Sequence, residues 1–351
     1  MILNDDTSMS RDPAELRRRL AQSTLALGGA PLGNLFRAVT DAQAMALLHH
    51  AYDAGIRYFD TAPHYGHGRS EQRMGDTLRD RERATYLLST KVGRLLEPRQ
   101  DAPRDQHGYV DTLSFVQRYD YSAGGVRRSL DDSLRRLGLA RVDIVYVHDI
   151  DRDTHGTAHP ARLADALDGG LPALAELKAQ GVIDAYGLGV NDVAICSEVL
   201  RYADLDVILL AGRYTLVDQS ALAELLPECQ RRGVAVVIGG PYNSGILATG
   251  ASPKDGSAPY FNYAPAPPEV VGRVAAIERV CAEFDVPLKA AALQFPRAHL
   301  AVATVLVGAR SIAELDENLC MGSAPIPKEF WQALRKRALV ADEAPLPDGA
   351  P

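Results

Sequence analysis

Ile56-Arg57-Tyr58-Phe59-Asp60-Thr61-Ala62-Pro63-His64-Tyr65-Gly66 is the most informative stretch of the chain. Its first five residues form a short, mainly apolar run, which predicts a buried strand that ends on a carboxylate. The residues that follow predict a loop carrying a phenol. Such polar side chains suit the place where the C-terminal ends of parallel strands meet on one face of an α/β barrel.

Two later apolar runs also end at a polar side chain. Residues 86–90 lead to Lys91, and residues 142–147 lead to His148. Asp60, Tyr65 and Lys91 each have an ordinary reading when taken singly, as a strand-end cap, a packing aromatic and a surface lysine. Their joint occurrence at successive strand ends favours one shared site instead.

These residue types indicate proton transfer through a phenol. An unperturbed tyrosine has a pKa near ~10, which is too high for easy deprotonation at neutral pH. A nearby ammonium group favours the phenolate, and a carboxylate holds that ammonium in place. The sequence therefore predicts an enzyme.

The whole chain alternates short apolar runs with longer segments of helical period. The predicted strands are residues 25–28, 56–60, 86–90, 142–147, 186–190, 207–211, 234–238 and 304–307. This alternation predicts a single-domain α/β fold, a (β/α)₈ TIM barrel. A doubly wound sheet is the alternative, but it ordinarily carries a Gly-x-Gly-x-x-Gly turn that Gly28-Gly29-Ala30-Pro31-Leu32-Gly33 does not supply.

The barrel is expected to span residues 21–340, with mobile ends at residues 1–20 and 341–351. Three connections are too long to be simple turns, namely residues 92–121, 149–170 and 239–268. All three leave the C-terminal end of a strand, so we expect long loops over the catalytic face.

Composition excludes several other classes of protein. The chain has 351 residues, 46% hydrophobic and 24% charged, as in soluble globular proteins. A net charge of −7 argues against nucleic acid or an anionic membrane as partner. The four separated cysteines read as reduced core thiols, with neither a disulfide framework nor a metal site. A cytoplasmic protein is expected, either a monomer or a homo-oligomer.

The segment Gly55–Glu71 resembles the signature of the aldo-keto reductases. Ser89-Thr90-Lys91-Val92-Gly93 and Val145-Tyr146-Val147-His148-Asp149 fall where that family places its lysine and histidine, and the likeness extends over residues 25–318. The resemblance implies that Tyr65 is the general acid/base, that Lys91 lowers its pKa, that Asp60 pairs with Lys91 and that His148 orients the substrate oxygen.

The segments at residues 30–34 and 239–247 most resemble the sugar-dehydrogenase branch of that family. This likeness implies oxidation of the anomeric hydroxyl of an aldose to a lactone. Reduction of aldehydes with NADPH and oxidation of pyridoxal in its hemiacetal form are the enzymatic alternatives. A non-catalytic subunit that senses the cofactor is a third possibility.

The last predicted strand leads into a helix through Gly308-Ala309-Arg310-Ser311. Backbone N–H groups at a helix start favour anions, although simple N-capping by Ser311 also accounts for the pattern. The resemblance implies that this segment holds the adenosine end of a nicotinamide dinucleotide. Glu314 would repel a 2′-phosphate, which favours NAD, while Arg310 leaves NADP open.

Three positions depart from the family pattern. Gly239 stands where most relatives place an aromatic ring against the nicotinamide, and Val190 and Ala211 replace a serine and a glutamine. Stacking is then expected from Tyr214 or Tyr242, or else the nicotinamide is held mainly by hydrogen bonds. The expected cofactor-binding residues are Asn191, Tyr214, Gly240, Pro241, Tyr242, Ser244, Gly308, Ala309, Arg310, Ser311, Glu314 and Asn318, and the expected substrate contacts, with packing as the alternative, are Pro31, Phe36 and Tyr119.

Overall fold

The computed structural model describes residues 13–348, and its centre is a closed barrel of eight parallel strands. Going round the barrel, the strand order is β1-β12-β9-β8-β7-β6-β3-β2, and β2 pairs with β1 to close it. The strands are β1 (Ala26–Gly28), β2 (Tyr58–Asp60), β3 (Leu87–Val92), β6 (Ile144–His148), β7 (Ala185–Val190), β8 (Val207–Ala211), β9 (Ala235–Gly239) and β12 (Val302–Gly308). Every predicted strand is a barrel strand, so the predicted (β/α)₈ fold is confirmed.

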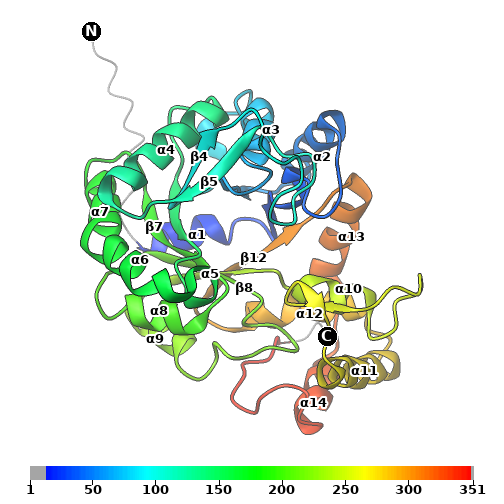
Figure 1. Ribbon diagram of the computed structural model, residues 1–351. Helices are drawn as coiled ribbons and strands as arrows, with labels where there is room; N and C mark the ends of the chain where they lie inside the picture. The colour runs from blue at the N-terminus through cyan, green and yellow to red at the C-terminus, as the bar shows by residue number, and fades with distance from the viewer. Residues whose placement is uncertain (1–12, 349–351) are drawn as a thin grey trace.

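Helices surround the strands on the outside of the barrel (Figure 1). They are α2 (Asp41–Asp53), α3 (Arg69–Leu78), α4 (Ala123–Leu137), α7 (Leu171–Ala179), α8 (Val193–Val199), α9 (Leu225–Arg232), α11 (Pro268–Glu283), α12 (Leu288–Gln294), α13 (Ile312–Ser323) and α14 (Lys328–Lys336). Local sequence explains their ends. Thr40 and Gln43 form a reciprocal capping box at the start of α2, and Gly138 ends α4 in the left-handed conformation.

The apolar side chains form two layers. One lies between the strands and the surrounding helices, and the other fills the inside of the barrel. Within the barrel the hydroxyl of Tyr58 lies 2.9 Å from that of Tyr146 and 3.0 Å from Ser89 Oγ, so this core becomes polar near the C-terminal ends of β2 and β3. Burial of each large apolar side chain stabilises the fold by about 1.5–3 kcal/mol.

The two chain ends differ from the expected mobile segments. Pro13–Leu20 forms helix α1, whose Leu16 and Leu20 are buried with the side chains inside the barrel. Arg17 donates hydrogen bonds to the carbonyls of Ala301 and Val302, at 3.2 and 3.3 Å. At the other end Ala344 is buried. Apolar surface at the N-terminal end of the barrel explains why α1 packs there. Residues 1–12 and 349–351 lie outside the described part of the chain.

The three long connections contain structure that the sequence pattern did not indicate. The first forms an antiparallel hairpin of β4 (Arg94–Pro98) and β5 (Phe115–Tyr119), and the second contains α5 (Arg152–His155) and α6 (His159–Asp165). The third contains α10 (Ile246–Thr249) and a short hairpin of β10 (Tyr260–Phe261) and β11 (Ala264–Pro265).

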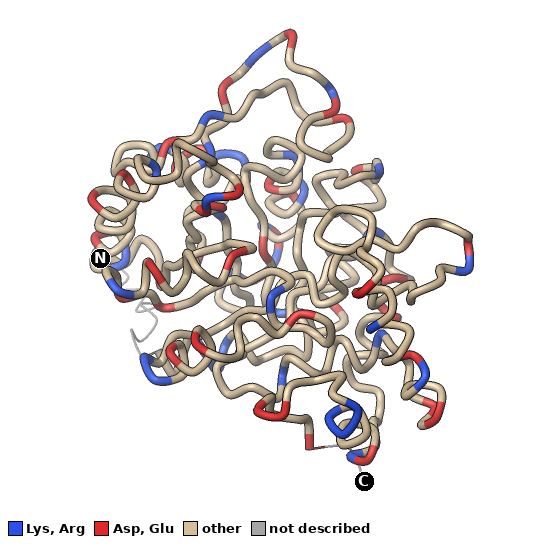
Figure 2. Tube along the Cα trace, turned by 60° about the horizontal axis from the view of Figure 1, so that its bottom comes forward, with Lys and Arg blue, Asp and Glu red and all other residues tan. Residues whose placement is uncertain are grey.

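The surface carries charges of both signs. Figure 2 shows basic and acidic residues interspersed along the outer helices and loops. No helix within residues 13–348 is both long and apolar enough to cross a membrane. Cys196, Cys229 and Cys281 are buried, but Cys320 on α13 is exposed and so is not the core thiol that was expected.

Candidate active site

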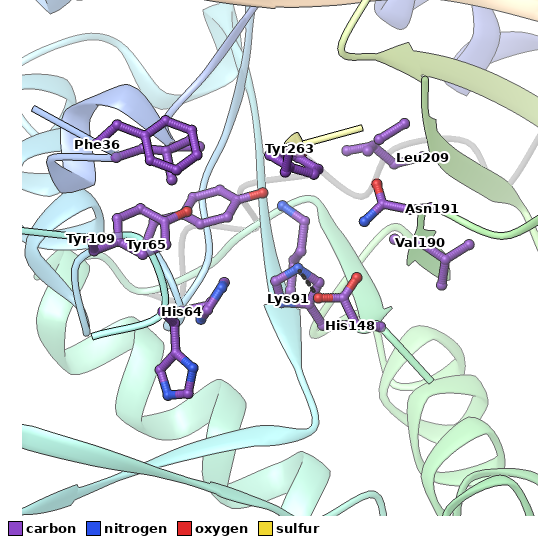
Figure 3. Close-up of a pocket in the computed structure, with 16 residues that line it drawn as sticks. Phe36, His64, Tyr65, Lys91, Tyr109, His148, Val190, Asn191, Leu209 and Tyr263 are labelled. Carbon is purple, nitrogen blue, oxygen red and sulfur yellow. Dashed lines mark ion pairs between the residues drawn. The ribbon is translucent and has the colours of Figure 1, made fainter. Parts of the chain in front are cut away.

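The four residues singled out from the sequence come together at the C-terminal end of the barrel. Figure 3 shows three of them, Tyr65, Lys91 and His148, in the wall of a cavity. Lys91 Nζ donates to Asp60 Oδ2 at 2.6 Å and to the carbonyl of Thr61 at 3.0 Å. The same Nζ lies 4.7 Å from the centroid of the Tyr65 ring, and the rings of Tyr65 and His148 meet edge to face at 6.0 Å. Asp60 ends β2 and His148 ends β6, while Lys91 lies within β3.

The Asp60–Lys91 ion pair is buried at 1% exposure on both sides. Ser89 Oγ donates a further hydrogen bond of 2.7 Å to Asp60 Oδ1. Burial raises the pKa of Asp60 and lowers the pKa of Lys91, while the contact between the two groups opposes both shifts. Removing either partner leaves a buried charge uncompensated, which costs about 3–5 kcal/mol.

Burial dominates the electrostatic environment of Tyr65. Burial raises the pKa of Tyr65 well above its ordinary value, and the carboxylates of Asp60 and Asp149 raise the pKa further. The Lys91 ammonium acts in the opposite direction but is itself neutralised by Asp60. The net effect is a raised phenol pKa, because burial outweighs the lowering by Lys91. The sequence positions of the four residues carry no information about desolvation.

His148 is neutral in this site. Burial lowers its pKa well below the ordinary value, and the cations of Arg94 and Lys91 lower it further. Its Nε2 lies 3.3 Å from Asp149 Oδ2. Asp149 is held in turn by a short ion pair with Arg94, which projects from β4.

A cavity of about 300 Å³ is lined by Tyr65, Lys91, His148 and Asp149. Sequence reasoning missed several members of its wall: His64, His107, Tyr109, Asp149 and Tyr263. His64 carried a usable signal, since it stands directly before Tyr65 in the signature segment. Asp149 carried a similar signal, since it stands directly after His148. His107, Tyr109 and Tyr263 come from long connections, and no local pattern indicates that those loops fold back over the barrel.

The three expected substrate contacts have different positions. Phe36 lines the cavity and is 59% exposed. Tyr119 instead packs edge to face on His155, with ring centroids 4.5 Å apart, so the packing alternative holds for it. Pro31 lies against Gly308, where a Cβ atom would come within 2.7 Å of Pro31 Cγ. It therefore belongs beside the cofactor segment.

Two further cavities adjoin the first. A cavity of about 300 Å³ shares Asn191 and Tyr263 with the catalytic one and is also lined by Gly240 and Ser244. A third cavity of about 450 Å³ shares Phe36 and Tyr263 with the first and Ser244 with the second. Together they provide room for an extended ligand that reaches away from Tyr65.

The two tyrosines expected to stack on a nicotinamide are not equivalent. Tyr214 is fully buried against Phe295 and His299, with ring centroids 5.3 and 5.8 Å away, so it cannot contact a ligand in these cavities. Tyr242 donates a hydrogen bond of 2.7 Å to Asn318 Oδ1 and so links the loop after β9 to α13. Pro241 beside it is buried.

The start of α13 shows how the expected adenosine segment is built. Ser311 accepts a hydrogen bond of 3.2 Å from the Glu314 backbone, as an N-cap. Glu314 Oε2 accepts one of 2.8 Å from the backbone N–H of Arg310. Ala309 is buried and Gly308 is exposed. Arg310 Nε is buried and has no partner within residues 13–348. A helix start beside a cation whose Nε–H is free to donate fits the anionic part of a dinucleotide.

Comparison with known proteins agrees with this geometry. The model of the aldo/keto reductase family matches residues 24–338. The chain is 46% identical to pyridoxal 4-dehydrogenase of Microbacterium luteolum, over 93% of this chain and 96% of that protein. It is 40% identical to D-threo-aldose 1-dehydrogenase of a Pseudomonas species, over 94% and 98%. An aldo-keto reductase from Bacillus halodurans, solved in its holo form, aligns with a TM-score of 0.69 and 28% identity, over 93% and 94%.

Proposed function

Because the chain belongs to the aldo/keto reductase family, and is therefore an oxidoreductase, we propose that it oxidises the C1 hydroxyl of a cyclic aldose of the L-fucose or D-threo-aldose type to the lactone. The observation that supports the proposal is the position of Tyr65. Its ring lies beside both Lys91 and His148 at the wall of the cavity, within reach of a bound hydroxyl.

Each residue then has a defined part. Tyr65 exchanges a proton with the substrate oxygen, as a base in oxidation and as an acid in reduction. His148 donates from a neutral ring to the same oxygen and fixes its direction. The Asp60–Lys91 pair keeps a cation beside the phenol. When bound, a nicotinamide dinucleotide supplies the hydride acceptor, and Asn191, Gly240, Ser244 and the start of α13 are the groups that would hold it.

The composition of the cavity wall supports a sugar as substrate. His64, Asp149 and Asn191 offer polar atoms, whereas Phe36 and Tyr109 offer aromatic surface. A cyclic sugar has hydroxyls at its edge and C–H groups on its faces, so it suits a cavity with both kinds of wall.

Pyridoxal is the second candidate, because the relative with 46% identity is named as a pyridoxal 4-dehydrogenase. In its cyclic hemiacetal form pyridoxal presents the same reacting group as an aldose, a hydroxyl on a carbon that also carries the ring oxygen. The aromatic side chains of the cavity would accommodate its flat ring.

NAD is the proposed cofactor. Glu314 is exposed at the start of α13 and its carboxylate is turned back to the N–H of Arg310. A 2′-phosphate near this place would meet a like charge, whereas a free ribose diol can donate to the carboxylate. Arg310 is turned towards the carbonyl of Leu35, 3.3 Å from its Nη2.

Steady-state assays of the purified protein test the proposal. NAD and NADP are each combined with L-fucose, related aldoses and pyridoxal, and formation of the reduced cofactor is followed. Turnover of an aldose that exceeds turnover of pyridoxal supports the first candidate, and the reverse result supports the second. Tight cofactor binding without turnover of any substrate, including aldehydes in the reducing direction, would identify a cofactor-sensing subunit instead.

A further inference from the structure

His64 is a polar side chain of the cavity that proton transfer through Tyr65 leaves unused. Its ring centroid lies 6.2 Å from that of Tyr65 and 5.8 Å from that of His148, and the latter two are 6.0 Å apart. The three rings therefore surround one region of the cavity at nearly equal spacing (Figure 3). When a substrate oxygen is bound to Tyr65 and His148, the groups on the adjacent carbon of the substrate come within reach of His64.

A chain of hydrogen bonds fixes the tautomer of His64. Arg94 can only donate, and its Nη1 lies 3.0 Å from Gln117 Oε1, which orients the Gln117 amide. Gln117 Nε2 then faces His64 Nδ1 at 2.7 Å and must donate to it. His64 Nδ1 is therefore an acceptor, and the ring proton of the neutral imidazole lies on Nε2.

Nothing in the surrounding structure competes for that proton. The contacts that His64 makes through hydrogen bonds in residues 13–348 are to Gln117 and, at 3.5 Å, to Arg94, and both use Nδ1. Burial lowers the pKa of His64 well below its ordinary value, and Arg94 lowers it further, so the ring stays neutral at pH 7. His64 thus presents one fixed N–H to the cavity.

The hydrogen-bond chain from Arg94 through Gln117 to His64 is held in place by contacts of Arg94. Arg94 is 6% exposed, lies 5.0 Å from the centroid of the Tyr119 ring and forms the short ion pair with Asp149. It belongs to β4 and Gln117 to β5, so the whole hairpin stabilises the arrangement.

We propose that His64 is a substrate-positioning residue whose Nε2–H binds the hydroxyl on the carbon next to the reacting carbon, and that Gln117 and Arg94 hold it in the donating tautomer. The inference rests on the proposed function and narrows it. The preferred substrates are aldoses and other α-hydroxy carbonyl compounds or their cyclic hemiacetals. A carbonyl compound without the neighbouring hydroxyl gains nothing from His64.

Two matched substrate pairs test the proposal. One pair is an aldose and its 2-deoxy counterpart, assayed in oxidation. The other is lactaldehyde and propanal, assayed in reduction with NADH and NADPH. Failure of wild type on both sugars would contradict the proposed sugar oxidation, and the aldehyde pair would still report on His64. Wild type is expected to favour the hydroxylated member of each pair by roughly tenfold or more in kcat/KM, since one lost hydrogen bond in a buried site has about that effect.

The variants then locate the source of the preference. His64→Leu should reduce it to within about threefold by slowing only the hydroxylated substrate, and His64→Gln, which keeps an N–H near the same place, should restore part of it. Gln117→Met should also weaken it. His67→Asn is the matched control, because His67 lies in the same loop without lining the cavity, and asparagine tolerates its positive φ of 53°.

The proposal would be overturned if His64→Leu lowered kcat/KM equally for both members of a pair. An unchanged preference in that variant, or no preference in wild type, would also overturn it. A titration with the reduced dinucleotide, monitored by fluorescence, establishes that each variant is folded and binds cofactor.

Discussion

The ammonium group of Lys91 lies over the face of the Tyr65 ring, 4.7 Å from its centroid, while its hydrogen bonds go to Asp60 and to the carbonyl of Thr61. Lys91 therefore influences the phenol through its charge. The carboxylate of Asp60 partly cancels that charge, and burial adds a larger effect of opposite sign. Proton transfer in this site depends on the balance of these three contributions.

Tyr65→Phe should lower turnover by at least ~10²-fold, the smaller end of a general acid–base contribution. Dinucleotide affinity should stay within about twofold, because the phenol faces the substrate. Single-turnover rates and a fluorescence titration measure the two quantities separately. Retention of more than about a tenth of the activity would show that another group carries the proton.

Lys91→Met should move the pH–rate profile of oxidation. Tyr65 accepts a proton in that direction, so the rate rises as pH rises towards the phenol pKa, which burial has already raised. Removing the cation raises that pKa further, and the rise in rate should shift to higher pH. Because Lys91→Met leaves Asp60 unpaired, the double variant Lys91→Met/Asp60→Asn serves as the folding control. An unshifted profile in a folded variant argues against this role for Lys91.

Glu314→Arg should improve kcat/KM for NADP relative to NAD by at least tenfold, which corresponds to about 1.4 kcal/mol. The reason is that a repelling carboxylate is replaced by a group that pairs with a 2′-phosphate. Glu317→Arg is the matched control, since Glu317 lies one turn further along α13 and pairs with Lys289 at 2.7 Å. A wild type that already prefers NADP would contradict the NAD assignment.

Tyr214→Phe and Tyr242→Phe should separate the two tyrosines. Tyr214 Oη is buried and has no partner among the described residues, so removing it should leave cofactor affinity unchanged and should not lower the melting temperature. Tyr242→Phe breaks the link to Asn318 and should weaken dinucleotide binding severalfold. Weaker binding in Tyr214→Phe would mean that this side chain reaches the cofactor after all.

Local signals carried the prediction of the barrel and of the four central residues. Apolar runs such as residues 86–90 mark strands directly, and parallel strands bring their C-terminal ends together whatever the loops do. The walls of the cavity depend on long-range pairing instead. Arg94 pairs with Tyr119 across a hairpin whose strands are far apart in sequence. Neither composition nor periodicity indicates such a pairing, nor the position of Tyr263.

The same limit applies to electrostatics and to the chain ends. The spacing of Asp60, Tyr65 and Lys91 indicated which groups interact, but the net direction of the Tyr65 pKa depends on burial, which only the packed loops define. Likewise α1 is too short to be predicted from its own sequence. Helices of this length are stabilised mainly by tertiary packing, and the sequence does not show which surface α1 packs on.

The contact between α1 and the last barrel strand has a consequence for how the chain folds during synthesis. Arg17 binds the carbonyl of Ala301, 284 residues later. At translation rates of about 5–20 residues per second, Ala301 is synthesised roughly 15–60 s after α1. Until β12 emerges from the ribosome, the barrel whose N-terminal end Leu16 and Leu20 cover is incomplete. Although α1 is the first helix within residues 13–348, we expect it to be among the last to dock, and its apolar side chains can bind chaperones in the meantime.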